Sequence, residues 1–338
     1  MGPVHNVLAA TWLVGAPNLT PEQRLFLSKT VEGAVSNIAL LEGLPGTGKS
    51  LTLGYLTVIL MLLGVKVLGT GQSNSAAAAL NEKAYEVIQA HEATLPVLSD
   101  LKSKIVRVFN PARERLYMRT VLGGAGHINS HVPGDCLAAR VLEFVRNHPH
   151  DADCITLKEI HNSEALGSKS RARRPQGVLA DVQRKVLTEA GLILATSYSA
   201  SLLSNLDLAV DACIFDEAGQ ASEPNVMTVL GNQLHLQLVV LAGDEMQLPP
   251  VVKSLTVKKD PLGDVLATTL FTRLLVGYSK IEKFMLSVNF RSHPSLVSMP
   301  SKVFYAGDMT AAQGLSWDTP LARSVGSFLR GGALGTAG

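Results

Sequence analysis

The sequence has few cysteines, almost no net charge and no apolar run long enough to span a membrane. Its 338 residues include three cysteines and no C-x-x-C pair, which argues against a disulfide scaffold and a common zinc ribbon. The longest apolar stretch, residues 51–65, is shorter than the roughly 20 residues of a membrane span. Residues 1–10 lack the charged start and apolar core of a signal peptide. We therefore expect an intracellular protein with no membrane partner.

The charge balance gives no general reason for the protein to bind nucleic acid, because the formal net charge is only +2. Any such binding must come from a local surface. With 46% hydrophobic and 17% charged residues, the composition is typical of a globular protein of about two domains.

One octapeptide, residues 43–50, fits the phosphate-binding pattern G-x-x-x-x-G-K-[ST] without a mismatch. An apolar run at 37–41 predicts a buried strand before it, and the stretch at 51–63 predicts a helix after it. Glycines let the backbone curl so that several N–H groups point at one anion. Lys49 would reach the β- and γ-phosphates of a nucleotide, and the Ser50 hydroxyl would bind Mg²⁺. The residues expected to hold the nucleotide are Gly43, Gly46, Thr47, Gly48, Lys49 and Ser50.

Two later segments carry polar side chains that ATP hydrolysis needs. The apolar run 212–215 predicts a buried strand that ends in Asp216 and Glu217. At such a strand end Asp216 would hold the metal, and Glu217 would accept a proton from the attacking water. A third strand, predicted at 236–242, leads to Gln247. The prolines that follow could hold Gln247 toward the γ-phosphate, or the segment is a rigid turn without catalytic duty.

Weaker signals lie outside these motifs. A helix is predicted to begin after Thr20, which places Gln23 on its first turn, where an amide can read the edge of adenine or simply face solvent. Ser73 and Asn74 follow a short predicted strand and could bind a backbone phosphate, although their spacing favours a simple helix cap. A strand predicted at 191–197 also ends in two hydroxyls.

Residues 91–184 interrupt this order and read as an insertion, mostly irregular apart from a possible strand at 105–109. A basic patch at 168–175 could contact a phosphate backbone or be a solvated loop. The His and Cys residues between positions 127 and 161 match no zinc spacing, so we do not predict a zinc site.

Four segments together resemble motifs I to IV of superfamily 1 helicases, namely residues 43–50, 216–220, 243–250 and 289–294. The most similar group contains the nonsense-mediated-decay helicase and the senataxin-like proteins, and residues 299–305 resemble that group's Pro-Ser-x-x-Phe-Tyr segment. The resemblance implies an ATP-dependent 5′-to-3′ translocase on single-stranded RNA or DNA. It also implies two RecA-like domains with ATP in the cleft between them.

The same resemblance assigns roles to individual residues. Gln23 would read adenine, and Phe290 would stack on it. Arg291 would act as an arginine finger that stabilises charge on the γ-phosphoryl oxygens. The segments that face nucleic acid in the family fall on Ser73, Asn74, Thr196 and Ser197. The chain departs from the usual residues of the family at Gly219, Asn289, Phe290 and Ser292.

The resemblance implies an α/β fold with a mainly parallel sheet. We expect an N-terminal tail at 1–20, a RecA-like ATP-binding domain at 21–285 that holds the insertion, and a partial second RecA-like domain with a loose tail at 286–338. Motifs V and VI of the family have no counterpart after residue 305. We therefore expect a truncated helicase that uses ATP and Mg²⁺ and acts on single-stranded RNA or DNA.

Two other functions stay open. The chain could be a nucleotide-gated module that binds nucleic acid or a protein with little turnover, because losing one arginine finger costs roughly 10³-fold or more in rate. A small-molecule kinase would share the phosphate loop but would not need residues 243–250 or Arg291.

Overall fold

The computed structural model describes residues 3–34, 36–122, 132–165, 175–203, 206, 208–233, 235–251 and 267–313. The chain divides into two compact units. The larger comprises Met1–Glu42 and Ser50–Phe284, and the smaller comprises Gly43–Lys49 and Met285–Gly338. Each is described by itself.

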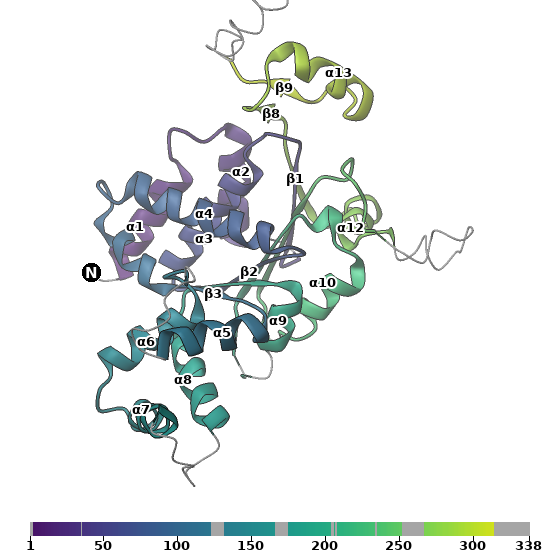
Figure 1. The fold of residues 1–338 in the computed structure, drawn as a ribbon. Coiled ribbons are helices and arrows are strands. Elements are labelled where there is room, and N and C mark those ends of the chain that lie inside the picture. The colour runs from purple at the N-terminus through teal and green to yellow at the C-terminus, as the bar shows by residue number, and fades with distance from the viewer. Residues whose placement is uncertain are drawn as a thin grey trace, which may run out of the picture. The chain divides into compact units, whose positions relative to one another are not determined.

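A seven-stranded sheet with the order β3-β4-β2-β5-β6-β1-β7 forms the centre of the fold (Figure 1). The first six of these strands pair in parallel, from β3 to β1. Their residues are mostly Val, Ile, Leu and Ala, which suits strands that are covered on both faces. The strands are β1 Ile38–Gly43, β2 Val67–Gly71, β3 Ile105–Val108, β4 Leu192–Thr196, β5 Ala212–Asp216, β6 Leu238–Gly243 and β7 Glu282–Leu286.

Helices connect and cover these strands. One apolar core joins alternate strand residues, such as Leu68, Ile193 and Phe215, to helices α5, α6, α8, α9, α10 and α12. Helix α4 packs against β2 and β4. The helices of the larger unit are α1 Pro3–Val14, α2 Pro21–Gly33, α3 Lys49–Leu62, α4 Asn74–His91, η1 Pro96–Lys104, α5 Pro111–Leu122, α6 Leu137–Asn147, α7 Ala152–Ala165, α8 Pro175–Glu189, α9 Ser197–Leu203, η3 Ala218–Gln220, α10 Glu223–Leu230 and α12 Leu270–Gly277.

This architecture confirms the predicted α/β class with its mainly parallel sheet. The strands expected around the phosphate loop and before Asp216 are present as β1 and β5. The helix expected at 51–63 is α3, which is almost completely buried because it is apolar all round. The proposed boundaries of the domains stay predictions.

The expectation of a mostly irregular stretch at 91–184 is wrong. The range contains β3, which lies at the edge of the sheet, and four α-helices, α5 to α8. Helix α6 is amphipathic, with Leu137, Val141 and Phe144 buried at helical spacing. The side chains of the basic patch at 168–175, and those of His127, His131 and His161, lie outside what the structure describes.

The smaller unit contains the phosphate loop and a short parallel pair, β8 Val288–Asn289 and β9 Thr310–Ala311. Helix α13, Pro294–Phe304, lies beside β9. A small apolar core is formed by Leu44, Val297 and Met309.

Two further features concern the cysteines and the apolar character of the helices. Cys136, Cys154 and Cys213 are all buried free thiols. Within the described ranges, no helix combines the length and the apolar character that crossing a membrane requires.

Candidate nucleotide and nucleic-acid site

The phosphate loop leaves β1 and enters α3, as the motif requires. Gly46 and Gly48 have φ values of 76° and 81°, a left-handed conformation that favours glycine. Gly43 has no room for a side chain, because an added Cβ would lie 2.7 Å from the Cβ of Lys49. The Thr47 hydroxyl donates to the Leu44 carbonyl at 2.8 Å, which closes the turn. The loop therefore has the curled backbone of a phosphate-binding nest.

Within the smaller unit, residues 289–292 pack directly on this loop. The Phe290 N–H donates to the Gly46 carbonyl at 2.8 Å, and the Asn289 amide donates to the Pro45 carbonyl. Asn289 Oδ1 in turn accepts from the N–H groups of Arg291 and Ser292 at 2.9 and 2.7 Å. Phe290 and Arg291 are exposed, so their side chains are accessible to a ligand. In the sequence Asn289 stands out only as a departure from the family, because its contact with Pro45 joins segments far apart in the chain.

The two predicted magnesium ligands come together in the larger unit. Asp216 ends β5 and is only 1% exposed. Its Oδ2 accepts a hydrogen bond from the Ser50 hydroxyl at 3.5 Å, and its Oδ1 accepts from the Glu217 N–H at 2.9 Å. A hydroxyl and one carboxylate suit Mg²⁺, which usually keeps several waters and takes few protein ligands. No group of three or more His, Cys, Asp or Glu residues that could hold a metal ion occurs in the described part of the chain.

Glu217 belongs to a hydrogen-bonded network of side chains. Its backbone is left-handed, with φ 56° and ψ 38°, a conformation that costs about 1–3 kcal/mol for a residue other than glycine. The Gln220 amide donates to Glu217 Oε2 at 3.5 Å and to Gln247 Oε1 at 3.0 Å. The Gln247 amide donates to Asp244 Oδ2 at 3.2 Å. Gln220 therefore links Glu217 to Gln247, and Asp244 holds the Gln247 side chain in place. Gln220 and Asp244 both lie inside the helicase-like motifs, but neither is among the site residues that the sequence predicts.

A cavity of about 390 Å³ adjoins these groups. Ser50, Asp216, Glu217 and Gln220 line it. Ser73 and neighbouring residues at the start of α4 line it as well. The two predicted metal ligands and the predicted general base, Glu217, therefore share one cavity with a predicted nucleic-acid residue, Ser73.

The strand register explains why these segments meet. Gly71, at the end of β2, lies opposite Thr196 of β4 and Asp216 of β5. The Ser197 hydroxyl donates to the Gly71 carbonyl at 3.1 Å and is buried. Ser73 caps α4 by accepting from the Ala76 N–H at 3.1 Å. The Ser73 and Ser197 hydroxyls thus both make structural hydrogen bonds, and contact with nucleic acid stays a prediction.

Gln23 also has a structural role. Its Oε1 accepts from the Thr20 N–H at 2.9 Å, while the Thr20 hydroxyl accepts from the Gln23 N–H at 3.2 Å. This reciprocal capping box begins α2, and Gln23 is only 2% exposed. The solvent-facing alternative for Gln23 is therefore wrong, and its contact with adenine stays a prediction.

Comparison with known proteins agrees with the motifs. Residues 151–255 match a family model described as an AAA domain. The ATP-dependent helicase upf1 of Schizosaccharomyces pombe is 28% identical over 92% of this chain and 30% of that protein. A regulator of nonsense transcripts 1 homolog of Drosophila melanogaster is 28% identical over 88% of the chain and 22% of that protein. The DNA-binding protein SMUBP-2 of Mesocricetus auratus is 26% identical over 87% of this chain and 28% of that protein.

The chain therefore spans less than a third of each of these three relatives. Their names and the AAA domain match confirm the resemblance to superfamily 1 helicases of the nonsense-mediated-decay type.

Proposed function

We propose that this chain, which is similar to superfamily 1 helicases over most of its length, binds and hydrolyses ATP with Mg²⁺ and uses the energy to move along single-stranded RNA or DNA. The observation that carries the proposal is the cavity at the ends of β2 and β5. It is lined by Ser50, Asp216 and Glu217 together with Ser73. Ser50 is also the last residue of the phosphate-binding octapeptide, so the motif itself contributes one lining residue to this cavity.

The roles of the residues follow from their chemistry. Backbone N–H groups of the loop and Lys49 hold the phosphates, while Ser50 and Asp216 are the groups that would hold Mg²⁺. The metal, when bound, neutralises charge on the phosphate oxygens. Glu217 accepts the proton of the attacking water, and Gln247 orients that water or contacts the γ-phosphate. Arg291 stabilises the charge that builds on the transferred phosphoryl group.

Coupling between ATP and the nucleic acid follows from the shared strand ends. A shift of Asp216 on β5 is transmitted to β2 through their parallel pairing, and β2 leads directly to Ser73 at the N-terminus of α4. The Ser197 hydroxyl ties the end of β2 to the next segment predicted to face nucleic acid. A short path of covalent bonds and hydrogen bonds therefore connects Asp216 to the segments predicted to bind the nucleic acid, and a change at the γ-phosphate is transmitted along it.

Binding of a fluorescent ATP analogue with Mg²⁺ tests the nucleotide site. Lys49→Ala removes a charge-assisted hydrogen bond of about 3 kcal/mol, so we expect affinity to fall about 100-fold. Lys29→Ala is the matched control, because Lys29 is exposed and its ammonium group pairs with Glu32 one turn further along the same helix. Equal affinities of the wild type and Lys49→Ala would show that the loop does not bind nucleotide.

Hydrolysis is tested separately from binding. We expect single-stranded RNA or DNA to stimulate multiple-turnover ATPase activity, and Glu217→Gln to abolish turnover while nucleotide affinity stays within about twofold. Tight nucleotide binding without turnover in the wild type would favour a nucleotide-gated binding module instead.

A further inference from the structure

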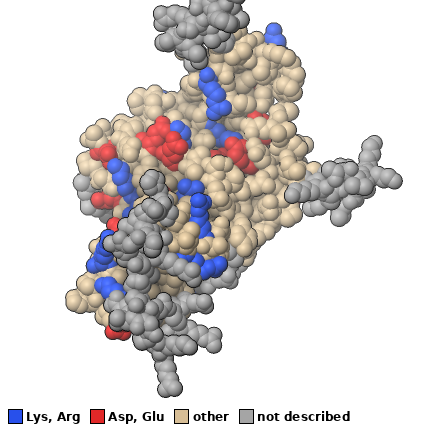
Figure 2. All heavy atoms as spheres, viewed as in Figure 1, with Lys and Arg blue, Asp and Glu red and all other residues tan. Residues whose placement is uncertain are grey.

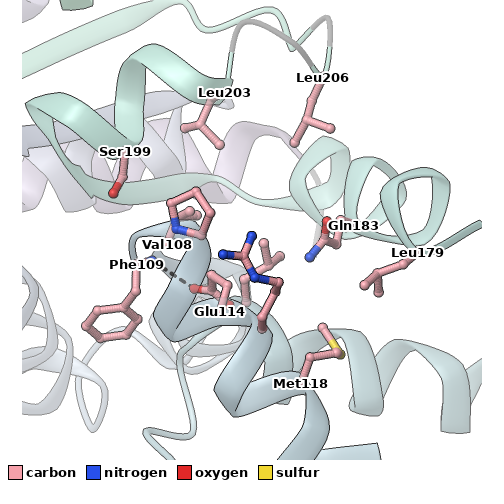
Figure 3. A pocket seen from close by; sticks show the side chains of 12 residues that line it. Val108, Phe109, Glu114, Met118, Leu179, Gln183, Ser199, Leu203 and Leu206 are labelled. Carbon is pink, nitrogen blue, oxygen red and sulfur yellow. Dashed lines mark hydrogen bonds between the residues drawn. The ribbon is translucent and has the colours of Figure 1, made fainter. Parts of the chain in front are cut away.

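A second cavity, of about 380 Å³, lies at the carboxyl end of β3. Because β3 is parallel to β4, β2 and β5, this end is on the same edge of the sheet as the candidate site. Apolar side chains form most of the wall. Figure 3 shows Leu203 and Leu206 on one side of the cavity, Leu179 and Gln183 on another, and Met118 below them.

Glu114 is a buried carboxyl group in this mostly apolar wall, whose other polar residues are Arg115, Gln183 and Ser199. Its residue is only 7% exposed. Oε1 accepts from the Phe109 N–H at 2.8 Å, whereas Oε2 has no hydrogen-bond partner among the described residues (Figure 3). Burial raises the pKa of Glu114 to about 7, against the opposite effect of the N–H groups of Phe109 and Ala138. Near neutral pH, Oε2 is therefore available to donate a proton to a ligand or to accept one from it.

A cationic and aromatic cluster lies beside the cavity. The guanidinium groups of Arg107 and Arg113 lie 4.6 and 5.1 Å from the centre of the Phe109 ring, and Arg113 also lies 5.7 Å from the Tyr117 ring. In Figure 2, Lys and Arg side chains appear on the face where Figure 1 places β3 and α5. Two cations that stack on Phe109, a residue of the cavity wall, suit the phosphates of a bound strand.

Hydrogen bonds connect the surroundings of the cavity to the two segments predicted to face nucleic acid, residues 73–74 and 196–197. Arg107 donates to the Asn74 carbonyl at 3.1 Å, which joins β3 to the start of α4. Ser199, in the cavity wall, accepts from the Thr196 hydroxyl at 3.2 Å and donates to it through its own N–H at 3.3 Å. A strand that follows Asn74 and Thr196 therefore passes the cavity.

We propose that this cavity receives one unstacked nucleobase of the bound single strand, while Arg107 and Arg113 contact the neighbouring phosphates. The inference rests on the proposed function and names a contact that the helicase motifs do not include. Apolar walls fit the faces of a planar base, and the volume is sufficient for a purine. A base with an exocyclic amine beside an unprotonated ring nitrogen, such as adenine or cytosine, can donate to and accept from the Glu114 carboxyl group. Unstacking is least costly for a base that is already single-stranded.

The test uses the full chain and single-stranded oligonucleotides with one 2-aminopurine, whose fluorescence rises when the base leaves the stack. We expect fluorescence to rise at one position of the bound strand. Gln183→Phe fills part of the cavity and should lower oligonucleotide affinity about tenfold and remove that rise. Thr188→Phe adds the same ring on an exposed position of α8 outside the cavity and should change neither.

Substitutions at Glu114 test the hydrogen-bonding part. Glu114→Leu leaves no polar group for the base and should lower affinity about tenfold. Glu114→Gln keeps both a donor and an acceptor, so affinity should stay within about twofold. Equal effects of the two variants would overturn the assigned contact.

The remaining outcomes separate this inference from the function on which it rests. If the wild type binds oligonucleotides but Gln183→Phe and Thr188→Phe behave alike, the cavity does not hold a base. If free 2-aminopurine riboside binds as tightly as the oligonucleotide, the ligand is a nucleoside and the strand is not its source. If the wild type binds no oligonucleotide although ATP binds, the nucleic-acid part of the proposed function fails, and this inference fails with it.

Discussion

At the residue scale, Asn289 shows how one side chain can hold a phosphate-binding loop. It is 3% exposed, donates to the Pro45 carbonyl and accepts from two backbone N–H groups, those of Arg291 and Ser292. A Cβ added to Gly46 would lie 2.8 Å from the Asn289 amide nitrogen and from the Arg291 Cβ. The same amide thus sets the path of the loop and the start of the segment that carries Arg291.

Asn289→Ala should weaken nucleotide binding and the fold together. The substitution leaves the Pro45 carbonyl and two N–H groups without their partner, which costs about 1–3 kcal/mol. We expect a lower urea midpoint and nucleotide affinity at least fivefold weaker, measured with a fluorescent ATP analogue. Asn232→Ala is the matched control, because Asn232 is exposed just after α10 and its amide donates to the Thr228 carbonyl in the last turn of that helix. Unchanged affinity would show that Asn289 does not position the loop.

Glu114 should make stability depend on pH in the direction opposite to an ordinary salt-bridged acid. Its pKa is raised from 4.5 to about 7 in the folded protein, so the folded state binds more protons than the unfolded state between these values. The stability of the wild type relative to Glu114→Gln should therefore fall as the pH rises from 5 to 8, by about 2 kcal/mol. Urea unfolding of both proteins at the two pH values measures this difference. Parallel pH profiles would contradict it.

At the element scale, η3, which follows β5, approaches the end of β6 too closely for side chains at Gly219 and Gly243. A Cβ on Gly219 would lie 2.7 Å from the Asp244 carbonyl oxygen, and a Cβ on Gly243 would lie 2.6 Å from the Gly219 nitrogen. This approach brings η3, which carries Gln220, within hydrogen-bonding distance of Gln247. The glycines therefore permit the network that fixes the predicted catalytic side chains.

Gly219→Ala should disturb both the fold and hydrolysis, although many members of the family that the sequence resembles have alanine there. The backbone must move to accommodate the methyl group, at a cost of about 1–3 kcal/mol. We expect a lower melting temperature and at least a fivefold lower ATPase rate, because Gln220 and Gln247 separate. Gly277→Ala has nothing within 4 Å of the added Cβ and should be nearly neutral. Equal melting temperatures for the two variants would refute the close approach.

At the scale of the whole molecule, the charge is nearly balanced while the local distribution is not. The net charge of +2 gives little long-range attraction for nucleic acid. Arg107 and Arg113 nevertheless lie together at the carboxyl edge of the sheet, next to the segments that follow β2 and β4. Affinity for a strand should therefore depend on a few local cations.

The salt dependence of binding measures this local contribution. If Arg107 and Arg113 each contact a phosphate, Arg107→Gln/Arg113→Gln should reduce the slope of log affinity against log salt by about 1.4, at roughly 0.7 per phosphate on a single strand. Lys29→Gln/Lys83→Gln removes the same charge from residues paired with Glu32 and Glu86, and its slope should match the wild type. Equal slopes for both double variants would contradict a phosphate contact by the arginines.

The sequence by itself determined the phosphate loop and the order of the motifs, because these depend on apolar runs and on short patterns of adjacent residues, and the family resemblance carried by these motifs implied the α/β class. It also placed Ser50, Asp216 and Glu217 at the ends of elements. Only the tertiary structure decided how the helices of residues 91–184 pack around β3 and that Gln220 and Asp244 support Gln247. It alone revealed that Glu114 has a buried oxygen facing a cavity. Those features depend on contacts between residues distant in the chain, which local patterns do not encode.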